Sequence, residues 1–241
     1  LNAKVEGPGL EPGSLDVVVA IIPGGEKPEQ DLLYTAHLDH PKESANDNAS
    51  GSAAILDIAS TFKNLINQGQ LPRPQRTLRF LWVPELYGTM AYVDAHPELH
   101  GPTLGGNFLA NLNLDMVGEN LELLHSQMHI SWPPVSISSA LSDVVPVMAK
   151  YVDRSDTRTS HHSSSNFNYR IVPFSNGGDH MIFNDGMIRI PSMMMGHWPD
   201  YTRHTSEDTP DKVDPVELER SEMIAAGTFW YLANLSEIQS L

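Results

Sequence analysis

Residues 31–66 read DLLYTAHLDHPKESANDNASGSAAILDIASTFKNLI, and this stretch decides the fold class. Its compact apolar run from Asp31 to Ala36 predicts a strand. A polar segment follows, and from Ser50 onward apolar residues recur at helical spacing, as Ile55, Ile58, Ala59, Phe62, Leu65 and Ile66. A strand that passes through a polar turn into an amphipathic helix is the repeating unit of layered α/β proteins.

The same alternation extends on both sides of this stretch. We expect further strands over 16–22, 77–83, 108–114 and, interrupted by Pro191, 187–195. We expect helices over 88–95, 138–151 and 215–235, and a short one that begins near Gly177. The segments 155–168, which contains His161-His162 in a solvated serine-rich run, and 196–214 are predicted to be long loops. The pattern indicates an α/β fold built on a largely parallel sheet.

The composition restricts the classes of partner that this chain is expected to bind. Its 241 residues fit one large domain, which we place over residues 1–241, with a further segment expected before Leu1. The formal charge of −15 disfavours nucleic acid and anionic membranes as partners, although solubility alone also explains such acidity. The absence of cysteine leaves His, Asp and Glu as metal ligands, which favours zinc, manganese or cobalt.

Hard metal ligands stand at the predicted C-terminal ends of several strands. They are His37, Asp39 and His40 after the second strand, Asp47 before the helix, Glu85 and Asp115 after the next strands, and His204 in a polar loop. Each has an ordinary explanation alone; Asp47, for example, suits a helix cap. Ligands bind outside the carboxyl ends of strands in open α/β sheets, so together these residues predict a two-metal hydrolytic centre.

The set resembles the M28 family of zinc aminopeptidases, of the co-catalytic bacterial leucyl aminopeptidase type. The matching segments follow one another from near residue 17 to the C-terminus. They are His37-Leu-Asp39, Asn46-Asp47-Asn48-Ala-Ser50-Gly51, Glu85 with Gly88-Thr89, Asn113-Leu-Asp115-Met116-Val-Gly118, Gly178-Asp179-His180-Met-Ile-Phe183, and His204-Thr-Ser-Glu-Asp208-Thr209-Pro-Asp211.

The resemblance implies a three-layer α/β/α fold of the zinc-dependent exopeptidase type and two zinc ions. By carry-over, His37 and Asp115 hold one ion, a Glu and His204 hold the other, and Asp47 bridges them. Asp39 is expected to assist catalysis by orienting His37, and the segment with Asp179 and His180 to support the loop that carries His204. The implied activity is hydrolysis of the N-terminal bond of a peptide with a free N-terminus, by an exported protein, secreted or periplasmic.

The chain departs from the family at one point. The family has two adjacent Glu residues, a general base followed by a zinc ligand, whereas this sequence has Pro84-Glu85. Glu85 is therefore either the base or a metal ligand, and the residues alone leave both roles open. His40, or an acid from elsewhere such as Glu119, is a candidate to complete the ligand set. Asp179 and His180 are further candidates for metal binding or for orienting the ligands.

Two other classes of function fit the same motifs. In the first, an enzyme with the same fold catalyses another reaction, as a carboxypeptidase, an amidohydrolase or a glutaminyl cyclase; the last of these usually binds one zinc. In the second, an M28-like domain binds peptides without catalysis, and Pro84 in place of a Glu keeps this alternative open. Trp198 and Tyr201 are predicted substrate contacts, and Met193 to Met195 are adaptable candidates for the same pocket.

Overall fold

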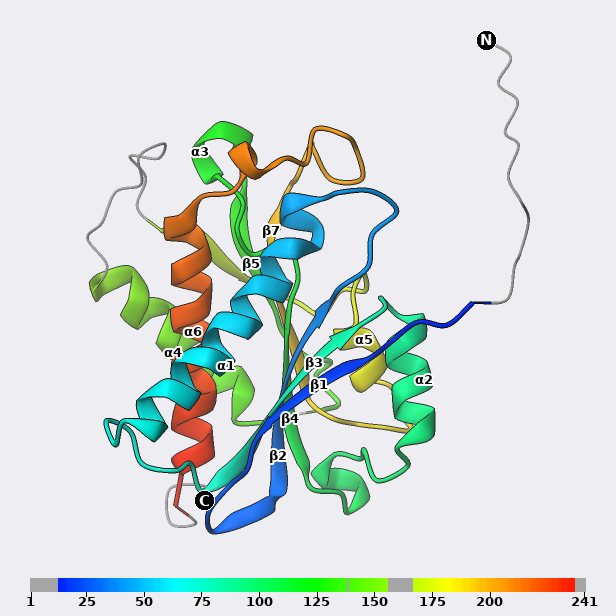
Figure 1. Cartoon of the computed structure of the whole chain (residues 1–241), viewed down its shortest axis with the longest axis vertical. Helices are drawn as coiled ribbons and strands as arrows, with labels where there is room; N and C mark the ends of the chain where they lie inside the picture. Colours follow the sequence, from blue (N-terminus) through cyan, green and yellow to red (C-terminus); the bar gives the residue numbers. More distant parts are fainter. Residues whose placement is uncertain (1–12, 138, 156–166, 237–241) are drawn as a thin grey trace.

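The computed structural model describes residues 13–137, 139–155 and 167–236 (Figure 1), so residues 1–12 and His161-His162 lie outside it. In these ranges one sheet contains β1 Val18–Ile22, β2 Lys27–His37, β3 Arg76–Val83, β4 Phe108–Leu114, β5 Gln127–Ser131, β6 Tyr169–Val172 and β7 Ser192–Trp198. The α-helices are α1 Gly51–Asn67, α2 Tyr87–Ala95, α3 Leu121–Leu124, α4 Leu141–Ser155, α5 His180–Phe183 and α6 Pro215–Asn234. None of the helices in these ranges has the length and hydropathy needed to span a bilayer.

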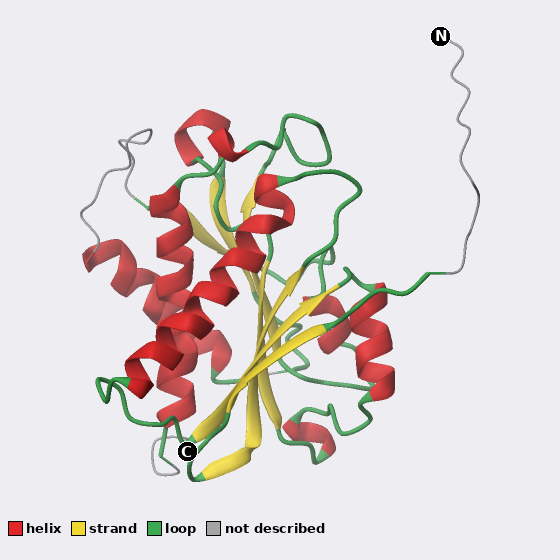
Figure 2. Ribbon diagram, viewed as in Figure 1, coloured by secondary structure: helices red, strands yellow, loops and turns green. Residues whose placement is uncertain are grey.

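The sheet is mixed and mostly parallel, with the strand order β1-β3-β2-β4-β7-β5-β6. β2 pairs in parallel with β3 and β4, β4 with β7, and β5 with β6. β1 runs antiparallel to β3, and β5 antiparallel to β7. Helices α1, α4 and α6 cover one face of the sheet and α2 and α5 the other (Figures 1 and 2), which confirms the expected three layers.

The central strands are buried on both faces, which explains their nearly continuous apolar sequences. On the side of α1 and α6, Tyr34 stacks on Phe80 with 4.8 Å between ring centroids. The Tyr34 hydroxyl donates to the carbonyl of Ala225, 3.1 Å away in α6. On the side of α2 and α5, Leu33 and Leu81 pack in a second cluster with Phe183. This packing fixes the neighbouring C-terminal ends of β2, β3 and β4.

Several element boundaries differ from the sequence prediction. Two short strands, β5 and β6, were missed because their few residues alternate weakly and lie among polar segments. β7 begins only after Pro191 and continues to Trp198, so Gly196 and His197, expected in a loop, belong to a strand. Proline lacks the N–H that an inner strand needs, which places it before the strand rather than inside it.

Candidate metal centre

Three predicted ligands meet at the C-terminal edge of the sheet. β2 ends at His37 and β4 ends one residue before Asp115, and the pairing of Thr35 with Asn113 places these ends side by side. The His37 Nε2 atom lies 3.0 Å from Asp47 Oδ1 and 3.5 Å from Asp115 Oδ1. All three side chains are buried, and their ligand atoms lie within 4.8 Å of one another, close enough to bind one cation.

Asp47 reaches this edge through a tightly held turn before α1. The Asn48 amide donates to the carbonyl of Leu114 at 2.9 Å, and its oxygen accepts from the backbone N–H groups of Gly51 and Met116. Gly51 is required here, because a Cβ atom would lie 2.1 Å from the carbonyl oxygen of Leu114. The close approach of α1 to the end of β4 therefore explains the Asn48 and Gly51 of the motif.

A second group of ligands shares Asp47. His204 Nε2 lies 3.0 Å from Asp47 Oδ2, the carboxylate oxygen that does not contact His37. Together with His40, these side chains offer three ligand atoms within 4.8 Å of one another. His204 has a left-handed backbone conformation, with φ of 61°. One carboxylate thus stands between two groups of potential ligands in the described residues.

The loop that carries His204 is tied to the Asp47 turn by two acids that the sequence analysis had not assigned a role. Asp208 accepts hydrogen bonds from the Ser44 hydroxyl at 2.6 Å and from the backbone N–H groups of Asn46 and Asp47 at 2.7 and 3.0 Å. Asp200 accepts from the Asn46 amide at 3.1 Å and caps the backbone of Arg203. The high Asp, Ser and Thr content of both loops is the sequence feature that could have indicated these hydrogen bonds.

Replacing Asp208 with asparagine should loosen the Asp47 turn. The variant keeps the shape but leaves one acceptor oxygen for three donors, so we expect a loss of about 1–3 kcal/mol in the free energy of unfolding. Metal affinity should fall by about 10- to 100-fold, as is usual when a group that orients a ligand is lost. Urea unfolding and metal titration measure both effects. Asp211→Asn, an exposed change in the same loop, should alter neither; equal effects of both variants would contradict this assignment.

His37 is oriented by the backbone of Asp39. Its Nδ1 atom lies 3.0 Å from the Asp39 carbonyl oxygen and 3.8 Å from the carboxylate. The Nδ1–H group therefore donates to the carbonyl, and the Nε2 atom is hydrogen-bonded to Asp47 and faces Asp115. The Asp39 carboxylate instead accepts from the backbone N–H of Glu85 at 2.7 Å. The expected orienting role of the Asp39 side chain is thus corrected: that side chain positions Glu85.

Glu85 lies beside the ligands without joining them. Neither ligand group found in the described residues includes it. Partial burial raises the pKa of its carboxyl above the ordinary value; the charge of His37 opposes this effect, and those of Asp115 and Asp47 add to it. The next position, where the family has its second Glu, is occupied by Leu86 if Glu85-Leu86-Tyr87-Gly88 is aligned with Glu-Glu-x-Gly.

Asp179 supports the Glu85 turn rather than the His204 loop. Its Oδ1 atom accepts from the backbone N–H of Leu86 at 2.8 Å and from the Thr89 hydroxyl at 2.7 Å. Burial raises its pKa to about 6. The His180 Nε2 atom lies 2.7 Å from the carbonyl oxygen of Ser175. Neither residue belongs to a ligand group of the described chain.

Glu119 is buried away from the ligands and does not complete them. Its carboxyl oxygens are buried, and Val213 faces it through a β-bridge. Burial, together with the charges of Asp200 and Asp208, raises its pKa to about 9, although the Ser126 hydroxyl opposes this shift. Neither ligand group of the described residues includes Glu119.

Glu119 should make the stability of the fold depend on pH. The folded pKa of about 9 lies above the ordinary 4.5, so the folded state is favoured most below pH 4.5 and loses stability as the pH rises toward 9. Glu119→Gln should remove this loss and stabilise the protein at pH 8 by roughly 2–4 kcal/mol. Urea unfolding at several pH values tests this. The exposed change Glu207→Gln is the control, and a destabilised Glu119→Gln at pH 8 would overturn the assignment.

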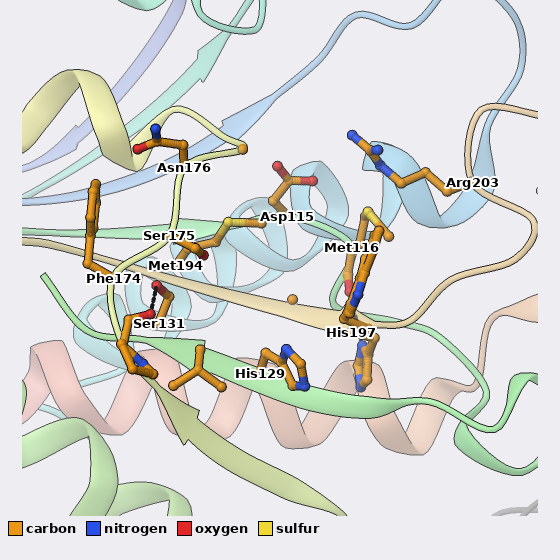
Figure 3. A pocket seen from close by; sticks show the side chains of 15 residues that line it. Asp115, Met116, His129, Ser131, Phe174, Ser175, Asn176, Met194, His197 and Arg203 are labelled. Carbon is orange, nitrogen blue, oxygen red and sulfur yellow. Dashed lines mark hydrogen bonds between the residues drawn. The ribbon is translucent and has the colours of Figure 1, made fainter.

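A pocket of about 580 Å³ opens beside Asp115. In Figure 3, Asp115 and Arg203 lie on one side of it, and His129 and His197 on the other. Phe174, Met194 and Trp198 contribute apolar wall. Arg203 also approaches the shared ligand, with its Nε atom 3.3 Å from Asp47 Oδ2. The pocket and the ligand groups therefore form one continuous site.

Only some of the predicted substrate contacts lie in this pocket. Trp198 lines the pocket, whereas Tyr201 is 75% exposed and is not among the lining residues. Of the three methionines in β7, Met194 faces the pocket, and Met193 and Met195 are core residues, as strand alternation requires. His129 and His197 were missed because no local pattern connects β5 with β7.

Comparison with known proteins decides the family. The sequence matches peptidase family M28 over residues 17–229. The chain belongs to this family. Its cluster of histidines and acids lies at the strand ends where the resemblance to this family places the metal ligands.

This peptidase is similar to the aminopeptidase NAALADL1 of Mus musculus, with 25% identity over 213 residues. The match covers 82% of the chain and 28% of that relative, so the chain spans well under half of the relative's length. The activity, substrates and partners of longer relatives therefore do not transfer by this likeness alone.

Solved structures share the fold of this peptidase. It superposes on an aminopeptidase from Aneurinibacillus sp. strain AM-1 with a TM-score of 0.69 and 19% identity, over 93% of this chain and 50% of that one. The zinc aminopeptidase BSAP from Bacillus subtilis gives 0.68 and 21%, over 93% and 52%. A glutaminyl cyclase from Fimbriiglobus ruber gives 0.64 and 14%, over 89% and 74%.

Proposed function

We propose that this peptidase is an aminopeptidase that uses two zinc ions to hydrolyse the N-terminal bond of peptides. The observation that carries the proposal is the position of Asp47 between two ligand groups, each completed by histidine, at the mouth of a pocket. The donors are imidazole and carboxylate, which suit zinc. The Asp47 Oδ2 atom is buried and faces the His204 Nε2 atom at 3.0 Å and the Arg203 Nε atom at 3.3 Å, so it lies against the second ligand group and a positive charge.

Each protein group has a distinct task in this scheme. A zinc pair held here supplies Lewis-acid chemistry: it polarises the scissile carbonyl and lowers the pKa of water. Glu85 takes the proton from the attacking water and returns it to the leaving amine. Its carboxyl can hold the proton between the two steps, and it lies beside the ligands without joining them. Asp39 keeps Glu85 in place by accepting its backbone N–H.

The ligand groups and the adjoining pocket favour an exopeptidase. A neutral α-amine is a nitrogen donor like the imidazoles of His37 and His204, so a zinc ion held here would accept it as a further ligand. The pocket beside Asp115 has room for one side chain, and its walls from Phe174, Met194 and Trp198 favour an apolar residue at the N-terminus. The substrate would then enter with its amine at the ligands and its first side chain in the pocket.

Metal content and substrate hydrolysis test the proposal together. We expect mass spectrometry to find about two zinc ions per chain, and aminoacyl-anilides with apolar side chains to be cleaved in a chelator-sensitive reaction. A set of N-terminally acetylated analogues should resist cleavage. Cleavage of acetylated substrates, or the absence of bound metal, would overturn the proposal. One bound zinc with cyclisation of N-terminal glutamine would instead identify a glutaminyl cyclase.

A further inference from the structure

We propose that His40 is a ligand of the second metal ion and takes the place of the carboxylate that this chain lacks at position 86. The inference rests on the proposed two-metal function and defines how this chain builds its second site. Three observations carry it: the hydrogen bonding of the His40 ring, its position beside His204 and Asp47, and the residue that follows Glu85.

The His40 ring is held so that one nitrogen remains available. Its Nδ1 atom lies 3.0 Å from the carbonyl oxygen of Lys42 and 3.4 Å from the Lys42 backbone nitrogen, and the shorter contact is the one in which Nδ1–H donates to the carbonyl. The opposite ring atom, Nε2, is buried and has no hydrogen-bond partner among the described residues. A histidine that gives one ring N–H to a backbone carbonyl and keeps the other nitrogen bare has the arrangement of a metal ligand.

The position of the ring completes a site. The His40 and His204 rings lie next to each other, with 5.6 Å between centroids. The ligand atoms of His40, His204 and Asp47 fall within 4.8 Å of one another, so ions bound at 2.0–2.2 Å need only small side-chain movements. His37 and Asp115 serve the other group, and Asp47 alone belongs to both.

The sequence explains why another ligand is needed. Leu86 has no donor atom, and its backbone N–H is already held by Asp179. Glu85 belongs to neither ligand group in the described residues. Without His40, the second ion would have two protein ligands, His204 and the shared Asp47. A catalytic zinc site normally has three protein ligands, and His40 supplies the third.

The exchange of a carboxylate for an imidazole changes the properties of the second site. Two neutral imidazoles and one shared carboxylate carry less negative charge than a set with its own Glu, so the second ion should bind more weakly than the first. Imidazole suits zinc, cobalt and copper, whereas carboxylates suit manganese and magnesium. The second site should therefore accept cobalt and reject manganese.

Metal titration of the purified chain tests the proposal without reference to activity. The metal-free protein would be titrated with zinc by calorimetry and with cobalt by visible absorption, as wild type, His40→Ala, Leu86→Ala and the remote control His100→Ala. We expect two binding events in the wild type, and one in His40→Ala with the tighter affinity unchanged. Leu86→Ala and His100→Ala should keep both events. Circular dichroism checks that each variant is folded.

The outcomes separate this proposal from the proposed function. Two events in folded His40→Ala, with unchanged affinities, would overturn the role of His40 and leave the two-metal function standing. A single event in both wild type and His40→Ala would overturn the second site itself. A wild type that binds no metal would overturn the proposed function as well. Loss of the weaker event in Leu86→Ala but not in His40→Ala would also contradict the ligand exchange.

Discussion

Asp47→Asn should abolish activity and remove most of the bound metal. Asp47 is the single side chain common to both ligand groups, and its two oxygens face His37 and His204 separately. The amide keeps the size of the side chain but removes its charge and one acceptor. We expect kcat/KM to fall by about 10³-fold or more, because the loss of a ligand exceeds the 10- to 100-fold typical of groups behind it.

The measurement is kcat/KM on an aminoacyl-anilide together with zinc content per chain. Asp57→Asn, an exposed change in α1, is the matched control and should leave both unchanged. Asp47→Asn with near-normal activity and two bound ions would contradict the bridging role. An inactive variant that keeps both ions would show that Asp47 acts in another way than by holding metal.

Glu85→Gln should lose activity and keep its metal. A general base that also returns the proton to the leaving group contributes about 10²- to 10⁴-fold, and glutamine cannot transfer a proton. Because Glu85 stands outside both ligand groups, the zinc content should not change. KM should change little, since the charge is removed without a change in the shape of the site.

The control is Glu43→Gln, an exposed acid in the loop between β2 and the Asp47 turn. Loss of one ion in Glu85→Gln would show that Glu85 is a ligand and would contradict the proposed role of His40 as the third ligand of the second ion. Activity within tenfold of the wild type would exclude Glu85 as the base.

Much of the fold could be predicted from local sequence. The β4 boundaries at Phe108 and Leu114 match the expected strand, since a buried parallel strand is a short apolar run between turn residues. β5 and β6 could not be predicted in this way. β5 is buried by its pairing with β7 and β6, and that pairing depends on residues about 40 or more positions away.

The identities of the candidate ligands also follow from the sequence, but their division into two groups does not. His37, Asp47, Asp115 and His204 were predicted from their places at strand ends, and the structure brings them together. The role of Asp208 required the contact between two loops separated by 162 residues. The role expected of Asp39 was wrong in detail, because the backbone turns so that its carbonyl, not its carboxylate, receives the His37 proton.

The sequence by itself determined the alternation of the longer strands and helices, the family and the donor atoms, because periodicity and motif spacing are local properties of a chain. The tertiary structure alone decided which donors lie together. The His40 and His204 rings lie beside each other, tilted by 51°, although 164 positions separate them. Asp39 and Asp179 hold the turn that contains Glu85 through its backbone N–H groups. Such choices depend on the register of parallel strands and the packing of loops over the sheet edge, which act between residues that the sequence keeps apart.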